Sequence, residues 1–368
     1  MTSWVSGIGC QLLGRGLSDA VIPAEAGIPS HGEPLTRHPI PETRYLIPMT
    51  EAMKYRDIHS ALSFRLSNFY PDRELESIAR LIAEHVTGLS WVQIRMNPDT
   101  ELSDSQRTDI GLIINRLANH EPIQYILGET EFYGMKLKVR PGVLIPRGET
   151  EELVEWIIKA KEKSKEERLK SKETFKEEKD GKDESDMEER ERILDIGCGS
   201  GAIAIALAKN LSDYTVIASD ISDAALKITN ENAQLNNVGI TTTHLDILTS
   251  SSLSFRPRVE PGAGFSPFAL IVSNPPYIPL SEKQSMAHHV ANQEPDLALF
   301  VPDEDPLIFY RAIAEFAKHN LTADGSVYVE IHDRLGAETA ELFRYYFTDV
   351  ELRQDIHGKD RMIRACNG

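Results

Sequence analysis

The stretch Ile193–Ala208, "ILDIGCGSGAIAIALA", decides the fold of this chain. Its apolar start ends at Asp195, and Gly197, Gly199 and Gly201 then follow in quick succession before a segment rich in Ala and Ile. Glycines let a ligand approach the backbone closely, and the first turn of a helix offers N–H groups. The stretch therefore predicts a strand, a tight turn and a helix, with a ligand at the turn.

The residues around this unit alternate between short apolar runs and helix-like segments. Such alternation predicts an α/β domain with a parallel, doubly wound sheet. Ligands of these sheets bind outside the carboxyl ends of the strands. The expected strands are 192–196, 215–220, 241–247, 268–274 and 326–331, and the expected helices are 201–210, 223–236, 305–320 and 336–347.

Two ligands fit the glycine turn. The string also matches the G-x-G-x-x-A signature of a dinucleotide site, which stays an alternative. However, Asp195 lies two residues before the first glycine, where its carboxylate would repel a pyrophosphate and attract an amine. Asp220 ends the next expected strand and can accept hydrogen bonds from a ribose. Asp246 either contacts an adenine amine or caps a turn, and Ile247 can cover the adenine face. An amine, a ribose and no phosphate together indicate S-adenosyl-L-methionine.

A second motif, "VSNPPYIP" at Val272–Pro279, follows another apolar run. Two prolines remove two backbone donors and fix two φ angles, so the segment cannot continue a central strand. The side-chain oxygen of Asn274 and the carbonyl of Pro275 can accept both hydrogens of a planar NH2 group, and Tyr277 can form a wall beside it. The motif by itself allows methylation of adenine in nucleic acid or of a glutamine amide in protein. Alternatively, the prolines simply end a strand.

The composition of the chain disfavours several classes of function. The 368 residues carry a net charge of −17 without a long basic block, which disfavours nucleic acid as the direct substrate. Apolar runs fall short of the roughly 20 residues that a membrane span needs. Cys10, Cys198 and Cys366 lie far apart and make neither a metal spacing nor a disulfide framework, as expected for a cytoplasmic protein.

Five regions are expected along the chain. Residues 1–47 are rich in Pro and Gly and predict a poorly ordered extension without a targeting signal. Residues 48–123 show helical spacing, with Ser103 as a helix N-cap, and form either a packing domain or a docking domain. A hairpin linker at 124–140 leads to the α/β domain at 141–368. Within that domain, residues 161–192 carry nearly balanced charges and predict a solvated, partly helical, flexible insertion, and 249–267 predict a long loop.

Several segments together resemble the PrmC/HemK family of release-factor glutamine methyltransferases. They are "EPIQYILGETEFYGM" (121–135), "LIPRGETEELVE" (144–155), "NPPYIP" (274–279), "EPDLALF" (294–300) and "DIHGKDRMIRA" (355–365). The resemblance implies a Rossmann-like, seven-stranded methyltransferase domain after a helical bundle, with the last strands near 350–352 and 361–365. It implies methyl transfer from S-adenosyl-L-methionine to the Gln amide of the Gly-Gly-Gln motif of class I peptide release factors, leaving S-adenosyl-L-homocysteine. It also implies that the helical domain docks the release factor.

The resemblance carries over to individual residues. Catalysis falls to Asn274, Pro275 and Tyr277, through direct in-line transfer without a metal. The cofactor residues are Phe132, Asp195, Gly197, Cys198, Gly199, Ser200, Gly201, Asp220, Asp246, Ile247 and Asn274. The substrate residues are Asn274, Pro275, Pro276, Tyr277, Arg147 and Glu151. Gly148 stands where the family usually has a second proline, and the segment 147–151, which includes Thr150, either shapes the rim of the site or caps a helix.

Overall fold

The structure is a computed structural model that describes residues 52–176, 190–249, 267–286 and 288–367. The expected extension at 1–47, the second half of the expected insertion and most of the expected loop at 249–267 lie outside these residues. Among the described helices, none is long and apolar enough to cross a membrane.

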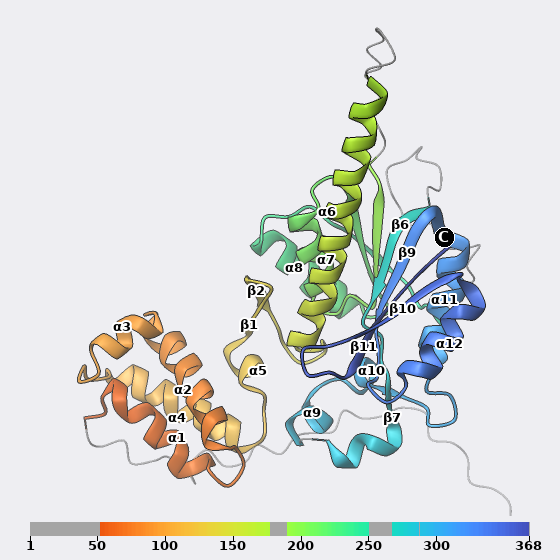
Figure 1. Cartoon of the computed structure of the whole chain (residues 1–368). Helices are drawn as coiled ribbons and strands as arrows, with labels where there is room; N and C mark the ends of the chain where they lie inside the picture. Colours follow the sequence, from red (N-terminus) through yellow and green to blue (C-terminus); the bar gives the residue numbers. More distant parts are fainter. Residues whose placement is uncertain (1–51, 177–189, 250–266, 287, 368) are drawn as a thin grey trace, which may run out of the picture. The chain divides into compact units, whose positions relative to one another are not determined.

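A helical bundle forms the first described part of the chain (Figure 1). Its buried core includes Leu62, Ile82, Ile110 and Ile114. Ser103 begins α4 as predicted, because its hydroxyl accepts from the N–H of Gln106 at 3.2 Å while the Gln106 side chain accepts from the N–H of Ser103. The elements are η1 (Tyr55–Asp57), α1 (Ile58–Leu66), α2 (Asp72–Thr87), α3 (Trp91–Met96), α4 (Asp104–Ala118) and α5 (Ile123–Leu127).

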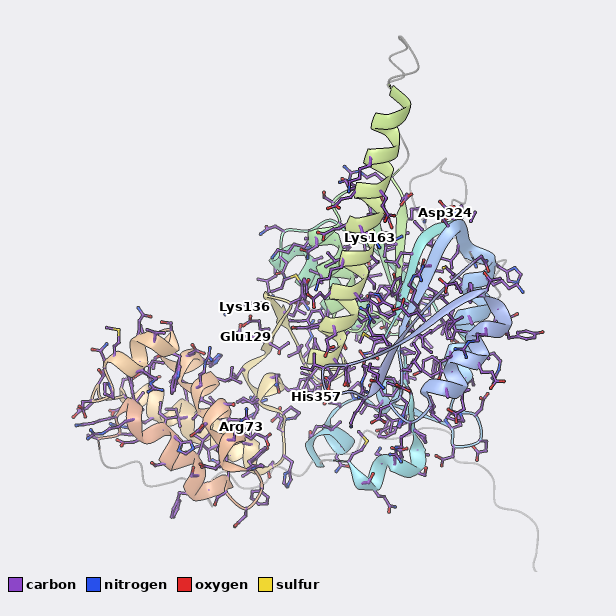
Figure 2. The ribbon with its side chains drawn as sticks, in the orientation of Figure 1. Arg73, Glu129, Lys136, Lys163, Asp324 and His357 are labelled. Carbon is purple, nitrogen blue, oxygen red and sulfur yellow. The ribbon has the colours of Figure 1, made fainter. Side chains whose placement is uncertain are left out.

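A β-hairpin follows the bundle. Strands β1 (Glu129–Phe132) and β2 (Met135–Lys138) pair antiparallel, and the side chains of Glu129 and Lys136 form an ion pair with 3.3 Å between Oε1 and Nζ (Figure 2). Helix α6 (Gly148–Lys176) comes next. Among the residues of α6 whose burial is described, the last buried apolar side chain is that of Ile158, and the later ones are mostly exposed. The first half of the expected insertion therefore continues a helix.

Seven strands of the described chain form one sheet, in the order β10-β11-β9-β6-β3-β4-β5. The five central and edge strands from β9 to β5 run parallel, and β11 pairs antiparallel with β9 and β10. The predicted seven-stranded α/β fold with a helical bundle before it is confirmed. The strands are β3 (Arg192–Ile196), β4 (Thr215–Asp220), β5 (Thr241–His244), β6 (Phe268–Ser273), β9 (Leu321–Glu330), β10 (Asp349–Gln354) and β11 (Asp360–Cys366).

Helices cover both faces of this sheet (Figure 1). Successive strand residues point to opposite faces, so Ile193 joins the apolar cluster with α6 and α7 while Leu194 joins the cluster with α11 and α12. Burial on both faces explains why these strands read as continuous apolar runs. The helices are α7 (Ala202–Asn210), α8 (Asp223–Leu235), α11 (Ile308–Asn320) and α12 (Gly336–Tyr346).

Short elements lie between β6 and α11. Strand β7 (Ile278–Pro279) pairs with β8 (Phe300–Val301), and η2 (Leu280–Ser285), α9 (His288–Gln293) and α10 (Asp296–Leu299) connect them. The chain order of the sheet reverses between β3 and β6, which places a ligand crevice outside the carboxyl ends of these two strands.

Candidate active site

The carboxyl ends of β3, β4 and β6 meet at one edge of the sheet. Ile196 pairs with Ser219 of β4 and with Ser273 of β6. Each serine hydroxyl ties down a strand end, since Ser219 donates to the carbonyl of Asp195 at 3.0 Å and Ser273 to that of Ile196 at 2.7 Å. The register therefore brings the glycine turn, Asp220 and Asn274 to the same edge.

The three glycines of the turn after β3 differ in the space around them. All three have positive φ, with 56° at Gly199 and 83° at Gly201. A Cβ on Gly197 or Gly199 would meet no described atom within 4 Å, whereas one on Gly201 would lie 2.9 Å from Cγ2 of Thr229. Gly201 therefore allows close packing against α8, and the first two glycines border open space.

The N–H groups of this turn are largely used within the protein. Those of Gly197 and Cys198 donate to the carbonyl of Ser219 at 2.8 and 2.9 Å, and that of Gly199 donates to Oδ2 of Asp220 at 2.9 Å. A pyrophosphate site depends on such groups pointing at the ligand. The arrangement therefore argues against the dinucleotide alternative.

Asp195 is a fully buried carboxylate at the end of β3. Its Oδ2 accepts from the N–H of Ala204 at 3.1 Å, and its Oδ1 has no hydrogen-bond partner among the described residues. Burial raises the pKa of Asp195 from 3.8 to about 7, and the charge of Asp220 adds to the rise. A buried acceptor without a donor is rare in folded proteins, and a cationic amine would satisfy it.

Asp220 braces the glycine turn. Besides the N–H of Gly199, it accepts from the N–H of Ser222 at 2.9 Å through Oδ1. Burial raises the pKa of Asp220, and these backbone hydrogen bonds oppose the rise. Each carboxylate oxygen has a second lone pair, so the predicted acceptance from a ribose remains compatible with this geometry.

Two further predicted cofactor residues follow β5, which is shorter than the expected strand and ends at His244. Asp246 accepts from the N–H of Leu248 at 3.0 Å and from the hydroxyl of Thr249 at 2.7 Å. These local bonds match the turn-capping alternative for Asp246. Ile247 is 9% exposed and packs in the cluster beside α11.

Three other predicted cofactor residues are enclosed by protein. Phe132 is 1% exposed, in the same cluster as Cys198, so the expectation that its ring contacts a cofactor finds no support in the arrangement of side chains. The Cys198 thiol lies 3.4 Å from the Thr229 hydroxyl, and Ser200 is 3% exposed. The side chains of Cys198 and Ser200 therefore do not border the open space beside the glycine turn.

The Asn-Pro-Pro-Tyr segment lines a cavity of about 270 Å³. Asn274, Pro275 and Tyr277 contribute to it together with Arg147, so four predicted substrate residues meet at one cavity. Its other lining residues are apolar: Leu144, Ile278, Met286, Val290, Ala298 and Leu299. Apolar walls with a few polar groups suit a small planar group.

A buried carboxylate joins the two sides of this cavity. The Nδ2 of Asn274 donates to Oγ1 of Thr150 at 3.1 Å, and Thr150 donates to Oε2 of Glu330 at 2.6 Å. The hydroxyl of Tyr277 donates to Oε1 of the same Glu330 at 3.1 Å. Thr150 therefore neither shapes the rim nor caps α6 with its side chain. Burial and the charge of Glu330 raise the pKa of Tyr277.

The sequence analysis missed Glu330. Its signal was an acidic residue at the end of an apolar strand, the same position that identified Asp195 and Asp220. Glu330 is 1% exposed, and burial raises its pKa against the hydrogen bonds from Thr150 and Tyr277.

Two predicted substrate residues are engaged within the protein. Arg147 pairs with Glu294, whose side chain is 1% exposed and also accepts from the N–H of Ile145 at 3.1 Å. Glu151 accepts from the N–H of Tyr133, at the hairpin turn, at 2.6 Å. Glu151 thus ties α6 to the hairpin, and its predicted substrate role stays a prediction.

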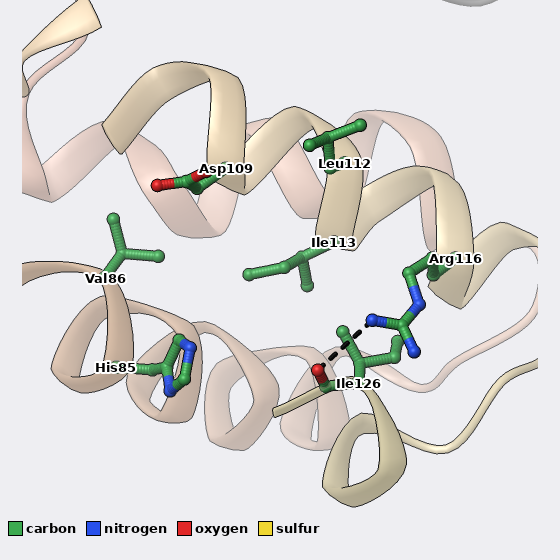
Figure 3. Close-up of a pocket in the computed structure, with 7 residues that line it drawn as sticks. All are labelled: His85, Val86, Asp109, Leu112, Ile113, Arg116 and Ile126. Atoms are coloured by element: carbon green, nitrogen blue, oxygen red, sulfur yellow. Dashed lines mark hydrogen bonds between the residues drawn. The ribbon is translucent and has the colours of Figure 1, made fainter. Parts of the chain in front are cut away.

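A separate cavity of about 280 Å³ lies within the helical part (Figure 3). Arg116 closes one end of it by donating to the carbonyl of Ile126 at 3.2 Å. Its lining is His85, Val86, Asp109, Leu112, Ile113, Arg116 and Ile126. None of these was assigned to chemistry by the sequence.

Comparisons with known proteins agree with this architecture. The PrmC N-terminal domain matches residues 60–128, and the methyltransferase small domain matches residues 183–295. The release factor glutamine methyltransferase of Flavobacterium psychrophilum is 42% identical over 301 residues, which cover 82% of this chain and 94% of the relative. That of Bacteroides thetaiotaomicron is 38% identical and covers 82% and 95%. That of Lactococcus lactis is 39% identical over 292 residues and covers 79% and 92%. The chain belongs to the release factor glutamine methyltransferase family.

Proposed function

We propose that this protein transfers a methyl group from S-adenosyl-L-methionine to the side-chain amide nitrogen of the glutamine in the Gly-Gly-Gln motif of class I peptide release factors. The observation that carries the proposal is the placement of Asp195 and Asn274 at the ends of adjacent strands β3 and β6, in a chain of this family. One residue suits a cationic cofactor, and the other suits a planar amide.

The residues around β3 fit the cofactor. The charge of Asp195 would attract its ammonium group, although the carboxylate is itself enclosed by protein, and the open space beside Gly197 and Gly199 would admit the cofactor close to the backbone. Asp220 would accept from its ribose hydroxyls with its remaining lone pairs. When bound, the cofactor supplies a methyl group already activated by a sulfonium charge, so the protein needs no further electrophile.

The residues around β6 fit the substrate. An amide nitrogen is a weak nucleophile because its lone pair is delocalised. Oδ1 of Asn274 and the carbonyl of Pro275 would accept its two hydrogens, which holds the nitrogen in place and stabilises the positive charge that develops on it. Tyr277 forms the wall against which the flat group lies. These residues act by position and electrostatics, and the proton leaves after the nitrogen has become cationic.

The helical bundle would dock the release factor. Phe64, Val92 and Met96 expose 85%, 67% and 75% of their surfaces, and a docked release factor would cover this apolar area. Release factors act on the ribosome, so the proposal places the enzyme in the cytoplasm. Neither nucleic acid nor membrane is required as a partner.

The test is to incubate the protein with methyl-labelled cofactor and a purified class I release factor, wild-type or with the motif glutamine replaced by alanine. We expect one methyl group on the motif glutamine, located by mass spectrometry, and none on the variant. An adenine-containing oligonucleotide serves as the competing substrate. Label on the oligonucleotide and not on the release factor would overturn the proposal in favour of amine methylation in nucleic acid.

A further inference from the structure

We propose that Glu330, acting through Thr150, sets the orientation of the Asn274 carboxamide, so that its oxygen and not its NH2 group faces the substrate. Glu330 is then a positioning residue of the reaction rather than a catalytic one. This inference rests on the proposed function, because it concerns the group that would hold the substrate amide.

Three elements bring the chain of hydrogen bonds together. Thr150 lies in the first turn of α6, Glu330 ends β9, and Asn274 follows β6. Ser273 pairs with Val329, so Asn274 and Glu330 leave neighbouring strands at the same level. Thr150 is 4% exposed and Glu330 1%, so water does not compete for these bonds.

The number of available protons decides the direction of each bond. An ionised carboxylate only accepts, so the single hydroxyl proton of Thr150 goes to Glu330 at 2.6 Å. The Oγ1 of Thr150 can then only accept, and the group of Asn274 that lies 3.1 Å from it must be the NH2 group. The carboxamide oxygen consequently points away from Thr150. A carboxamide turned by 180° would place two acceptors against each other, which is unfavourable in a buried site.

This orientation matches what the substrate requires. The nitrogen of a substrate amide brings hydrogens, so its partner must be an acceptor. With the Asn274 carboxamide reversed, two NH2 groups would face each other and the substrate nitrogen would not be held. The same Glu330 accepts from the hydroxyl of Tyr277 at 3.1 Å. One carboxylate therefore orients Asn274, through Thr150, and Tyr277 directly.

The substitution Thr150→Val keeps the shape of the side chain and removes the hydroxyl, while Thr150→Ser keeps the hydroxyl. We expect Thr150→Val to lower kcat on the release factor roughly 10- to 100-fold, with the cofactor Kd within about threefold of wild type, and Thr150→Ser to restore most of kcat. Thr339→Val is the matched control, because Thr339 is equally buried but bonds only to the carbonyl of Leu335 in its own helix. This control should keep wild-type kcat.

The substitution Glu330→Gln tests whether the Glu330 carboxylate fixes the orientation of the Asn274 carboxamide. A glutamine has an NH2 group in place of one of the two carboxylate oxygens, so it cannot accept from Thr150 and Tyr277 at the two positions that Oε2 and Oε1 occupy, and we expect a similar loss of kcat. Side-chain NMR of the protein without substrate provides a readout independent of activity: an NOE should link the NH2 protons of Asn274 to the Thr150 methyl group in wild type and weaken in Glu330→Gln.

Two results would overturn the inference: kcat of Thr150→Val within threefold of wild type, or an Asn274–Thr150 NOE unchanged in Glu330→Gln. Equal losses of kcat in Thr150→Ser and Thr150→Val would overturn it as well, since packing and not the hydroxyl would then matter. A wild-type enzyme without activity on any release factor would instead contradict the proposed function, and the NOE would still decide the orientation.

Discussion

Asp195 and Asp220 lie at the carboxyl ends of neighbouring parallel strands, where Asp195 is fully buried and Asp220 is partly buried. Asp220 is bonded to backbone N–H groups through both of its oxygens, whereas Asp195 has one oxygen bonded and one without a partner among the described residues. The difference gives the two residues different tasks. Asp220 holds the glycine turn, and we propose that Asp195 attracts the ammonium group of the cofactor.

This difference predicts how stability depends on pH in the absence of cofactor. The unfolded chain loses the Asp195 proton near pH 4, while the folded protein keeps it until about pH 7. The free energy of unfolding should therefore fall as pH rises through this window, by up to about 4 kcal/mol from this group. Asp195→Asn should be more stable than wild type at pH 8 and similar at pH 4, as measured by urea unfolding. The exposed Asp109→Asn is the control, and equal effects of both substitutions would refute the assignment.

Ionisation of Asp195 should also affect cofactor binding, but here a rise in pH should be favourable. The ammonium prefers ionised Asp195, so Kd for S-adenosyl-L-methionine should decrease as pH rises toward about 7 and level off above it. Asp195→Asn should bind weakly at every pH. Isothermal titration calorimetry between pH 5.5 and 8.5 measures both curves, and a wild-type Kd independent of pH would contradict this role.

A comparison of Gly199 with Gly88 separates the effect of a substitution on cofactor binding from its effect on backbone strain. Gly199 has φ of 56° and Gly88 has φ of 69°, and a Cβ on either would meet no described atom within 4 Å. Substitution by Ala should destabilise the fold by about 1 kcal/mol in each case because of the positive φ. Gly199→Ala alone should also weaken cofactor binding more than tenfold. If Gly88→Ala, in the bundle, reduced cofactor binding equally, the space beside Gly199 would not be the cofactor site.

Removal of the Asn274 carboxamide should abolish turnover without abolishing cofactor binding. We expect Asn274→Ala to lower kcat by several orders of magnitude and to change the cofactor Kd by less than about tenfold. Asn210→Ala, at the end of α7, removes an amide that bonds only to the carbonyl of Ala206 and serves as the control. Labelled methyl transfer to the release factor gives both rates. Near-wild-type turnover of Asn274→Ala would remove the basis of the proposed mechanism.

Glu294 should contribute more to stability than its pairing with Arg147 alone suggests. Its buried side chain serves both the guanidinium of Arg147 and the N–H of Ile145, so Glu294→Ala leaves two donors unsatisfied. We expect a loss of about 2–4 kcal/mol in the free energy of unfolding. Arg147→Met should cost less, because the Arg147 side chain is 35% exposed and water reaches the site. Urea denaturation that ranks the two variants in the reverse order would contradict this account.

Turnover should fall at acidic pH because of Glu330. Burial raises the pKa of Glu330, the charge of Glu149 from α6 adds to the rise, and the charge of Arg361 from β11 opposes it together with the hydrogen bonds from Thr150 and Tyr277. Protonation ends the requirement that Thr150 donate to this carboxyl. With saturating cofactor and substrate, kcat should drop on the acid side at a pH above the usual range of glutamate. Glu330→Gln should have a low and flat acid limb, and an unchanged limb in that variant would assign the titration to another group.

The sequence by itself determined the order of the elements and the ends of the strands. Short, largely apolar stretches that lead to Asp195, Asp220 or Asn274 specify a parallel sheet buried on both faces, and polar residues at strand ends must collect at its carboxyl edge. The capping residue Ser103 was equally readable, because its partners lie within three positions.

The tertiary structure alone decided which polar groups satisfy one another. Thr150 and Glu330 are 180 positions apart, Thr150 and Asn274 are 124 apart, and Arg147 and Glu294 are 147 apart. Local sequence patterns carry no information about such distant pairs, so the sequence did not show that Arg147 and Glu151 have hydrogen-bond partners within the protein. Hydrogen bonding in a buried site is a matching of donors to acceptors across the whole fold. The type of a residue tells which hydrogen-bond donors and acceptors it has. Only the folded chain determines which of them are left for a ligand.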